Sequence, residues 1–195
     1  MTNKPEYSHK GYKDFFSQLY TGVITMDTVS IPTQLHNLND KWNMYYHLPN
    51  NKNWDLSSYT VLMDNINSIE SVIELNHKLN DHVVRNCMLF VMREGITPMW
   101  EDPKNRNGGC FSYKVSNKHV PEVWKHLFYY LCGESICENN EHCSYVNGIT
   151  ISPKKNFCII KIWLSATILQ DPGCIVPIPN LSKQGCLFKK HEPEF

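Results

Sequence analysis

The stretch TPMWEDPKNRNGGCFSYKV, residues 97–115, is the most informative part of the sequence for predicting the fold. Its first half is a polar loop in which Trp100 directly precedes two carboxylates, Glu101 and Asp102. An indole is costly to leave in water and a carboxylate is costly to bury without a partner, so we expect this loop to serve a binding site. After a glycine pair, the segment CFSYKV is predicted to form a β-strand.

Strands and helices alternate on both sides of this stretch. The predicted strands cover residues 41–48, 59–64, 87–93, 110–115, 148–152 and 157–164. The predicted helices cover residues 68–79, with Ser68 as the N-cap, and 121–131, with Pro121 in the first turn and Gly133 past the end. This order predicts an α+β fold, an antiparallel sheet with helices on one face and the other face free to curve around a ligand.

Residues 1–34 show no sustained periodicity, so they are predicted to be a tail or a loosely attached arm. Residues 35–195 are predicted to form a single domain. Lys and Arg together equal Asp and Glu together, at 19 each, and this balance argues against a non-specific polyanion binder. Any contact with nucleic acid is therefore expected to be local.

The eight cysteines follow a polar N-terminal stretch without the apolar segment of a secretory signal. We therefore expect reduced thiols and a location in the cytoplasm, with the nucleus as an alternative. No run of about 18 apolar residues is present, so no membrane span is expected.

The full set of tryptophans and the motif around Trp100 resembles the eukaryotic translation initiation factor 4E family, which binds the 7-methylguanosine cap of mRNA. The core W-E-D-x-x-N-x-x-G-G is specific, whereas tryptophan spacing alone is a weak signal. The matching elements, in the order of the family, are Trp42, Trp54, Gly95–Gly109, Trp124 with Leu131–Ser135, and Ile160–Trp163. The resemblance implies a curved antiparallel sheet with helices on the convex face and a cap-binding slot on the concave face.

By this resemblance, Trp54 and Trp100 sandwich the methylated base, Glu101 takes its edge, and Trp163 touches the methyl group. The chemistry is consistent, because a cationic ring between two indoles gains stacking and cation–π attraction. The N1–H and N2 amine of guanine are parallel donors that a carboxylate accepts as a bidentate pair. Asp102 is expected to shape the loop by bonding backbone amides of the following turn.

The family holds the cap triphosphate with basic residues, and here the pattern departs. The first family position is Cys110 and the third falls on Ile159, whereas an ungapped match places Lys154 at the second. The remaining candidates for phosphate contacts are Lys155, Lys161, which shares strand parity with Trp163, and Lys183 near the C-terminus. A plain solvated turn is the alternative for the two hairpin lysines.

The family also binds a scaffold or repressor through a short helical peptide on its helical side. The corresponding residues here are His36, Leu38, Ile69 and Ile73. An isoleucine at position 73 lacks the indole N–H with which the family's tryptophan meets the peptide backbone. A changed partner and no partner are equally compatible with this departure, as is an Ile73 that only packs inward.

The sequence therefore predicts a divergent member of this family, such as a viral copy or a lineage-specific paralogue, that binds capped mRNA in translation initiation. The alternative is a cap-binding repressor or decoy that does not recruit the usual scaffold. An enzyme is not expected, because no P-loop, GxSxG or HExxH motif occurs. No cofactor is expected, and a zinc site remains a minor alternative to buried thiols at Cys132, Cys137, His142 and Cys143.

Overall fold

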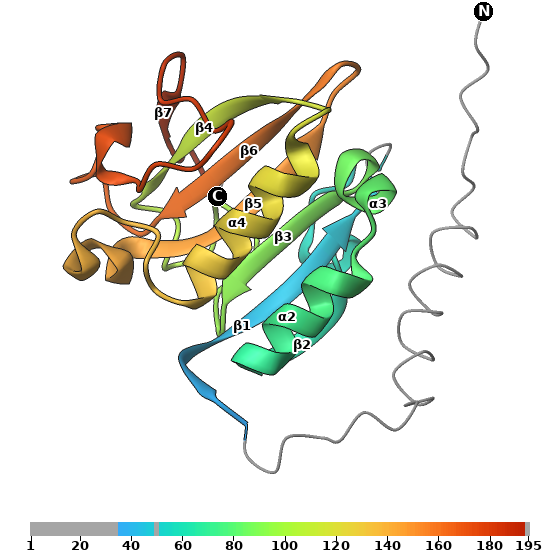
Figure 1. Ribbon diagram of the computed structural model, residues 1–195. Coiled ribbons are helices and arrows are strands. Elements are labelled where there is room, and N and C mark those ends of the chain that lie inside the picture. Colours follow the sequence, from blue (N-terminus) through green and yellow to red (C-terminus); the bar gives the residue numbers. More distant parts are fainter. Residues whose placement is uncertain (1–34, 49–50, 194–195) are drawn as a thin grey trace, which may run out of the picture. The chain divides into compact units, whose positions relative to one another are not determined.

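The computed structural model describes residues 35–48 and 51–193 and shows one curved antiparallel sheet with helices on one face (Figure 1). The seven strands lie in the order β2-β1-β3-β5-β6-β4-β7. Their bounds are β1 Asn37–His47, β2 Thr60–Ser68, β3 Met88–Arg93, β4 Gly109–Ser116, β5 Val146–Pro153, β6 Phe157–Leu164 and β7 Leu187–Lys190. The predicted α+β fold is confirmed, and each predicted strand lies within or overlaps an observed one. The predicted arm over residues 1–34 lies outside the described residues.

The helices are α2 (Ile69–Lys78), α3 (Asp81–Asn86) and α4 (Val120–Cys132), and short 3-10 turns cover Leu56–Ser58, Asn140–Tyr145 and Pro172–Cys174. Both predicted helices are present with their predicted ends. The Ser68 hydroxyl accepts from the Ser71 amide at 3.2 Å as the N-cap of α2, and Gly133 is the C-cap of α4.

Strand alternation gives the sheet two chemically different faces. In β6, Ile160 and Ile162 are fully buried, whereas the alternating Lys161 and Trp163 belong to the opposite face. In β1 the alternating residues Trp42, Met44 and Tyr46 are all buried. Figure 1 shows α2 and α4 lying across the same side of the sheet, so the face that carries Lys161 is the one without these helices.

Two elements were not predicted from the sequence. Helix α3 is only six residues long and begins where the Asn80 side chain accepts from the Val83 amide at 3.0 Å. Strand β7 is four residues long and pairs with β4, where Cys110 lies opposite Lys189. Both are too short to show a hydrophobic period, so neither was predicted from the sequence pattern.

The glycine pair before β4 is required for a reason other than the tight turn that the sequence indicates. A Cβ on Gly108 would lie 1.7 Å from the Leu164 carbonyl oxygen of β6. A Cβ on Gly109 would lie 2.5 Å from Cζ of Phe188 in β7. Neither glycine is among the residues with positive φ, so close approach of the neighbouring strands excludes side chains here.

The segment after β6 carries no long helix among the described residues. Within the described residues it contains only the 3-10 turn at Pro172–Cys174 before β7.

All eight cysteines are free thiols. Among residues 35–48 and 51–193 no group of His, Cys, Asp and Glu is arranged to hold a metal ion, so the zinc alternative at Cys132–Cys143 gains no support. The described helices include none that is long and apolar enough to cross a membrane.

Candidate functional site

A hollow of about 580 Å³ opens on the sheet face opposite the helices. Five segments build it: the β1–β2 loop, β3, the loop of residues 98–101, β5 and β6. All four side chains predicted to hold the base line this one hollow, together with one of the four predicted phosphate ligands. These residues are Trp54, Trp100, Glu101, Trp163 and Lys161.

The first indole, Trp54, lies in the β1–β2 loop as predicted, and half of its surface is exposed. One of its faces stacks on the buried His47 ring, with centroids 4.2 Å apart and planes 3° from parallel. His47 Nε2 donates to the Asn53 carbonyl oxygen at 2.8 Å, so the ring also fastens the backbone that carries the indole. The residue therefore has one covered face and one face left for a ligand.

The second indole, Trp100, has the same construction from a different part of the chain. It stacks on His191, just beyond β7, with centroids 5.4 Å apart and planes 18° from parallel. His191 is buried, and its Nδ1 donates to the Asn105 carbonyl oxygen at 2.7 Å. Burial lowers the pKa of His191, opposed by the Asn105 hydrogen bond, so the ring favours its neutral form.

The loop that carries Trp100 and Glu101 is held by its own polar side chains. Asp102 Oδ2 accepts from the Thr97 amide at 2.7 Å and from its hydroxyl at 2.8 Å, and Oδ1 accepts from the Lys104 amide at 2.8 Å. The fully buried Asn105 donates to the carbonyl oxygens of Thr97 and Met99. The expectation that Asp102 shapes this loop is confirmed, and its two neighbours are thereby positioned.

The floor of the hollow is apolar. Trp163 packs with Phe90, Met92 and Ile96, and its indole N–H donates to the Thr150 hydroxyl at 2.7 Å. The hydrogen bond to Thr150 and the apolar packing therefore fix the orientation of the Trp163 ring. Tyr59 lines the wall, where burial and then the Glu101 charge raise its pKa, so its hydroxyl stays neutral.

Two lysines stand over the Trp100 ring. Lys161 Nζ of β6 lies 5.5 Å from the ring centroid and Lys189 Nζ of β7 lies 5.0 Å from it. Strand register explains the pairing, because Cys110 of β4 lies between Trp163 and Lys189. Cys110, where the resemblance implies a basic residue, is thus a buried thiol, and β7 brings Lys189 beside it.

The other predicted phosphate ligands lie outside the lining of the hollow. Lys154 and Lys155 are exposed on the β5–β6 turn, and Lys183 Nζ donates to the Gly173 carbonyl oxygen at 3.2 Å. Sequence reasoning missed His47, Lys189 and His191. The first could have been noticed from its position at the end of a strand just before the Trp54 loop, but the other two follow the matched motifs and carried no signal.

A family model described as eukaryotic initiation factor 4E matches residues 37–182 of this chain. The chain belongs to the initiation factor 4E family. A curated initiation factor 4E of Eremothecium gossypii is 30% identical over 167 residues, which cover 79% of this chain and 70% of that protein. An initiation factor 4E homolog of Acanthamoeba polyphaga mimivirus is 37% identical over 87 residues, which cover 45% of this chain and 29% of the homolog's length.

Solved structures of the 4E family share the fold. A schistosome eIF4E complexed with m7GpppG and 4E-BP has a TM-score of 0.60 and 25% identity, covering 69% of this chain and 74% of that one. Caenorhabditis elegans eIF4E-3, in complex with the 4E-binding protein Mextli and a cap analogue, has a TM-score of 0.60 at 22% identity over 68% of this chain and 76% of that one. The matched family region ends before β7, so Lys189 and His191 lie outside it.

The residues predicted to contact a 4E-family partner gather around the start of α2. His36 Nδ1 pairs with Glu70 at 2.7 Å, and the His36 carbonyl oxygen accepts from the Ile69 amide at 2.9 Å. Ile69 and Ile73 are 46% and 44% exposed, whereas Leu38 is half-buried. Ile73 therefore does not pack inward, and that alternative is wrong.

Proposed function

We propose that this initiation factor 4E family member binds the 7-methylguanosine cap of mRNA in the hollow between Trp54 and Trp100. One observation carries the proposal: two indoles, each with an imidazole against one face, line the same hollow as a carboxylate and a lysine. A ring whose one face is covered stacks a ligand on the other. A planar cationic base meets this arrangement because it gains stacking and cation–π attraction on both sides.

Glu101 is assigned to the base edge. It lies next to Trp100 in a loop that Asp102 and Asn105 hold in place, so its carboxylate is positioned before the ligand arrives. A carboxylate that accepts two parallel N–H donors of guanine selects against adenine, which has no such pair. Trp163, on the floor, is assigned to the methyl group.

The triphosphate is assigned to Lys161 and Lys189. Both ammonium groups lie within 5.5 Å of the Trp100 ring centroid, so both are near enough to bind phosphates attached to a base stacked there. Lys52, which also lines the hollow, is a third candidate. The hollow is not lined by Lys154, Lys155 or Lys183, so we assign these lysines to contacts farther from the base.

The role in translation initiation is supported by family membership and by solved relatives that carry both a cap and a 4E-binding protein. The second candidate role is a cap-binding repressor or decoy. One observation favours it, namely that the exposed patch of Ile69 and Ile73 contains no indole donor for a bound peptide backbone. In both roles the chain acts by recognition rather than by turnover.

Titration of tryptophan fluorescence with 7-methyl-GTP tests the proposal. Trp54→Ala and Trp100→Ala should each weaken binding about 5- to 150-fold, the equivalent of about 1–3 kcal/mol of stacking. Glu101→Ala should weaken it to a similar extent through the lost charged hydrogen bonds. Tyr129→Ala removes a half-buried aromatic ring from α4, on the opposite face, and should leave binding unchanged.

Unmethylated GTP is the matched ligand control, because it presents the same edge without the ring charge. It should bind more weakly than 7-methyl-GTP, and equal affinity would remove the cation–π contribution. Full binding by both tryptophan variants would falsify the proposed sandwich.

A further inference from the structure

The sheet face that carries the hollow continues beyond it along β6. Residues two apart on a strand share a face, so Trp163, Lys161, Ile159 and Phe157 form one row. At roughly 3.3 Å per residue, Phe157 lies about 20 Å from Trp163. The row therefore leads from the floor of the hollow to the β5–β6 turn.

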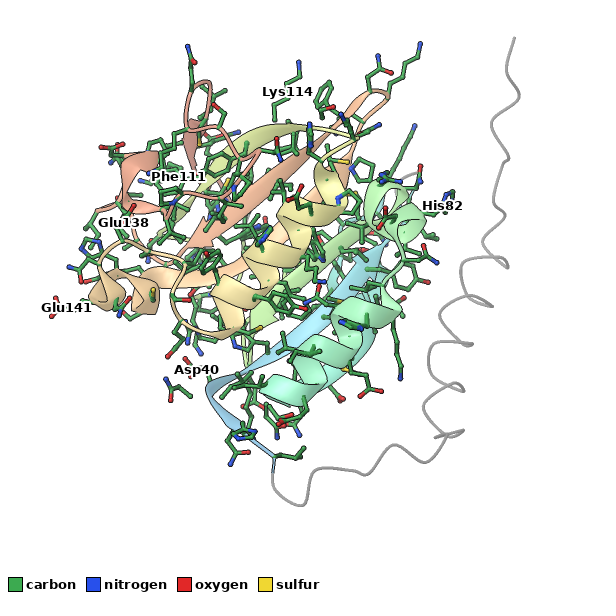
Figure 2. The ribbon with its side chains drawn as sticks, in the orientation of Figure 1. Asp40, His82, Phe111, Lys114, Glu138 and Glu141 are labelled. Atoms are coloured by element: carbon green, nitrogen blue, oxygen red, sulfur yellow. The ribbon has the colours of Figure 1, made fainter. Side chains whose placement is uncertain are left out.

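Phe157 at the end of this row is half-buried and carries a cation on its ring. Lys114 Nζ of β4 lies 4.5 Å from the Phe157 ring centroid. The register of β4 and β6 places Lys114 opposite Ile159, so Lys114 lies on the same sheet face as Ile159 and Phe157. Figure 2 shows the Lys114 side chain projecting outward from β4.

The charged side chains on this face of β4, β6 and β7 are all positive. The same-face positions of β4, β6 and β7 include Lys114, Lys161 and Lys189 and no carboxylate, as the register shows. Glu192, past the end of β7, pairs with Lys189 at 3.3 Å. The exposed Lys154 and Lys155 lie on the turn that precedes Phe157. The chain has zero net charge, so this concentration of cations is local.

We propose that Phe157 and Lys114 form a second nucleobase platform, which binds a base of the RNA body just after the cap. This inference rests on the proposed cap-binding function and extends it to the RNA. A base stacks on an aromatic ring without regard to sequence, while the ammonium groups of nearby lysines donate hydrogen bonds to the phosphates. The ligand is thus capped RNA rather than the cap alone, held at two aromatic sites with lysines between them.

A plain surface cation–π pair is the competing explanation of the contact between Lys114 and Phe157. It predicts no difference between a short and a long cap ligand. The two explanations therefore separate on ligand length.

The test compares 7-methyl-GTP, a capped pentanucleotide and the same pentanucleotide without a cap. The parent chain should bind the capped pentanucleotide more tightly than 7-methyl-GTP. Phe157→Ala should weaken the capped pentanucleotide about 5- to 100-fold and leave 7-methyl-GTP unchanged. Phe157→Leu, which keeps apolar bulk without a π-face, should behave in the same way, and Phe157→Tyr should retain full affinity.

Lys114→Ala should weaken the capped pentanucleotide and lower the salt slope of its binding by about one. Lys125→Ala is the matched control, because it removes the same charge from an exposed position of α4, on the opposite face of the sheet. The uncapped pentanucleotide should bind weakly to every variant.

Four results would overturn the platform. Parent and Phe157→Leu chains could bind the capped pentanucleotide equally, or the parent could bind it no better than 7-methyl-GTP, in which case cap binding stands and the platform does not. The Phe157 variants could lose both ligands equally, which would place Phe157 in the support of the hollow. If the parent fails to bind 7-methyl-GTP at all, the cap-binding function fails first and the platform with it.

Discussion

At the scale of single residues, two histidines behind two tryptophans distinguish this site. His47 and His191 each cover one indole face and each donate a ring N–H to a loop carbonyl oxygen. For His191 this donation assigns the neutral proton to Nδ1, because a carbonyl oxygen only accepts. Its Nε2 is buried without a hydrogen-bond partner among the described residues, so a second proton would be poorly accommodated.

The stability of the fold should consequently depend on pH through His191. Burial lowers the pKa of this ring in the folded chain, so below about pH 6.5 the unfolded chain binds a proton that the folded chain resists. The free energy of unfolding should therefore fall as the pH decreases below about 6.5, by at most about 1.4 kcal/mol per pH unit for this residue. Urea denaturation at several pH values between 5 and 8 measures it.

His191→Gln is the control for this prediction, because the amide keeps a donor for the Asn105 carbonyl oxygen but does not titrate. Its pH dependence should be flatter than that of the parent by the contribution of one group. Identical slopes in the two proteins would contradict the assignment.

At the scale of elements, helix α2 exposes one pair of apolar side chains to solvent while it packs on the sheet through another. Its capping box at Ser68 and Ser71 fixes where the helix begins, and the four-residue spacing of Ile69 and Ile73 puts both on one exposed face. Val72 and Leu75 of the same helix are buried against the sheet. Different residues of α2 therefore pack on the sheet and face solvent, so the exposed Ile69 and Ile73 can be changed without disturbing the core.

Replacing both exposed isoleucines by aspartate should leave the free energy of unfolding within about 0.5 kcal/mol, since neither side chain is buried. If α2 is the partner surface, the double variant should lose capture of a 4E-BP fragment while its affinity for 7-methyl-GTP is unchanged. Calorimetry with both ligands measures the two effects.

Glu74→Ala, a change on an exposed residue of the same helix, is the control and should capture the fragment normally. Unchanged capture by the double variant would move the partner surface elsewhere. A parent chain that binds 7-methyl-GTP but not the fragment would favour the decoy role.

At the scale of the whole molecule, the hollow is an assembly of segments from most of the described chain. His47 comes from the first strand and His191 from beyond the last, and both end beside tryptophans of the same hollow. Strand β7 contributes Lys189 to this site and also covers the outer edge of β4. The C-terminal strand therefore has a structural and a binding role together.

Removal of residues 187–195 should show both roles. The affinity for 7-methyl-GTP should fall about tenfold or more, because Trp100 loses its His191 support and the triphosphate loses Lys189. The exposed edge of β4 should also promote self-association, since it offers unpaired backbone groups. Fluorescence titration and size-exclusion chromatography measure the two effects.

The full-length double variant Lys189→Ala with His191→Gln separates these effects, because it keeps the strand. It should lose affinity without self-associating. An unchanged affinity after the deletion would show that β7 lies outside the binding site.

Much of the fold was predictable, because its long elements carry their own periodicity and their own ends. The alternation in β1 and β6, the cap at Ser68 and the proline in the first turn of α4 are all local signals, and each matched an observed element. The short β7 carried no such signal, and α3, although Asn80 caps it, is too short to show a hydrophobic period. The roles of Trp54, Trp100, Glu101 and Trp163 stay predictions, although all four line one hollow.

The sequence by itself determined the order of strands and helices, the membership of the 4E family and the loop that Asp102 shapes, since these depend on residues near one another in the chain. Only the tertiary structure decided which groups stand behind the indoles and which lysines stand over Trp100. The physical reason is sheet pairing: β7 joins β4 through backbone hydrogen bonds that any short segment can make. The side chains that this pairing brings to the hollow therefore leave no local pattern in the sequence.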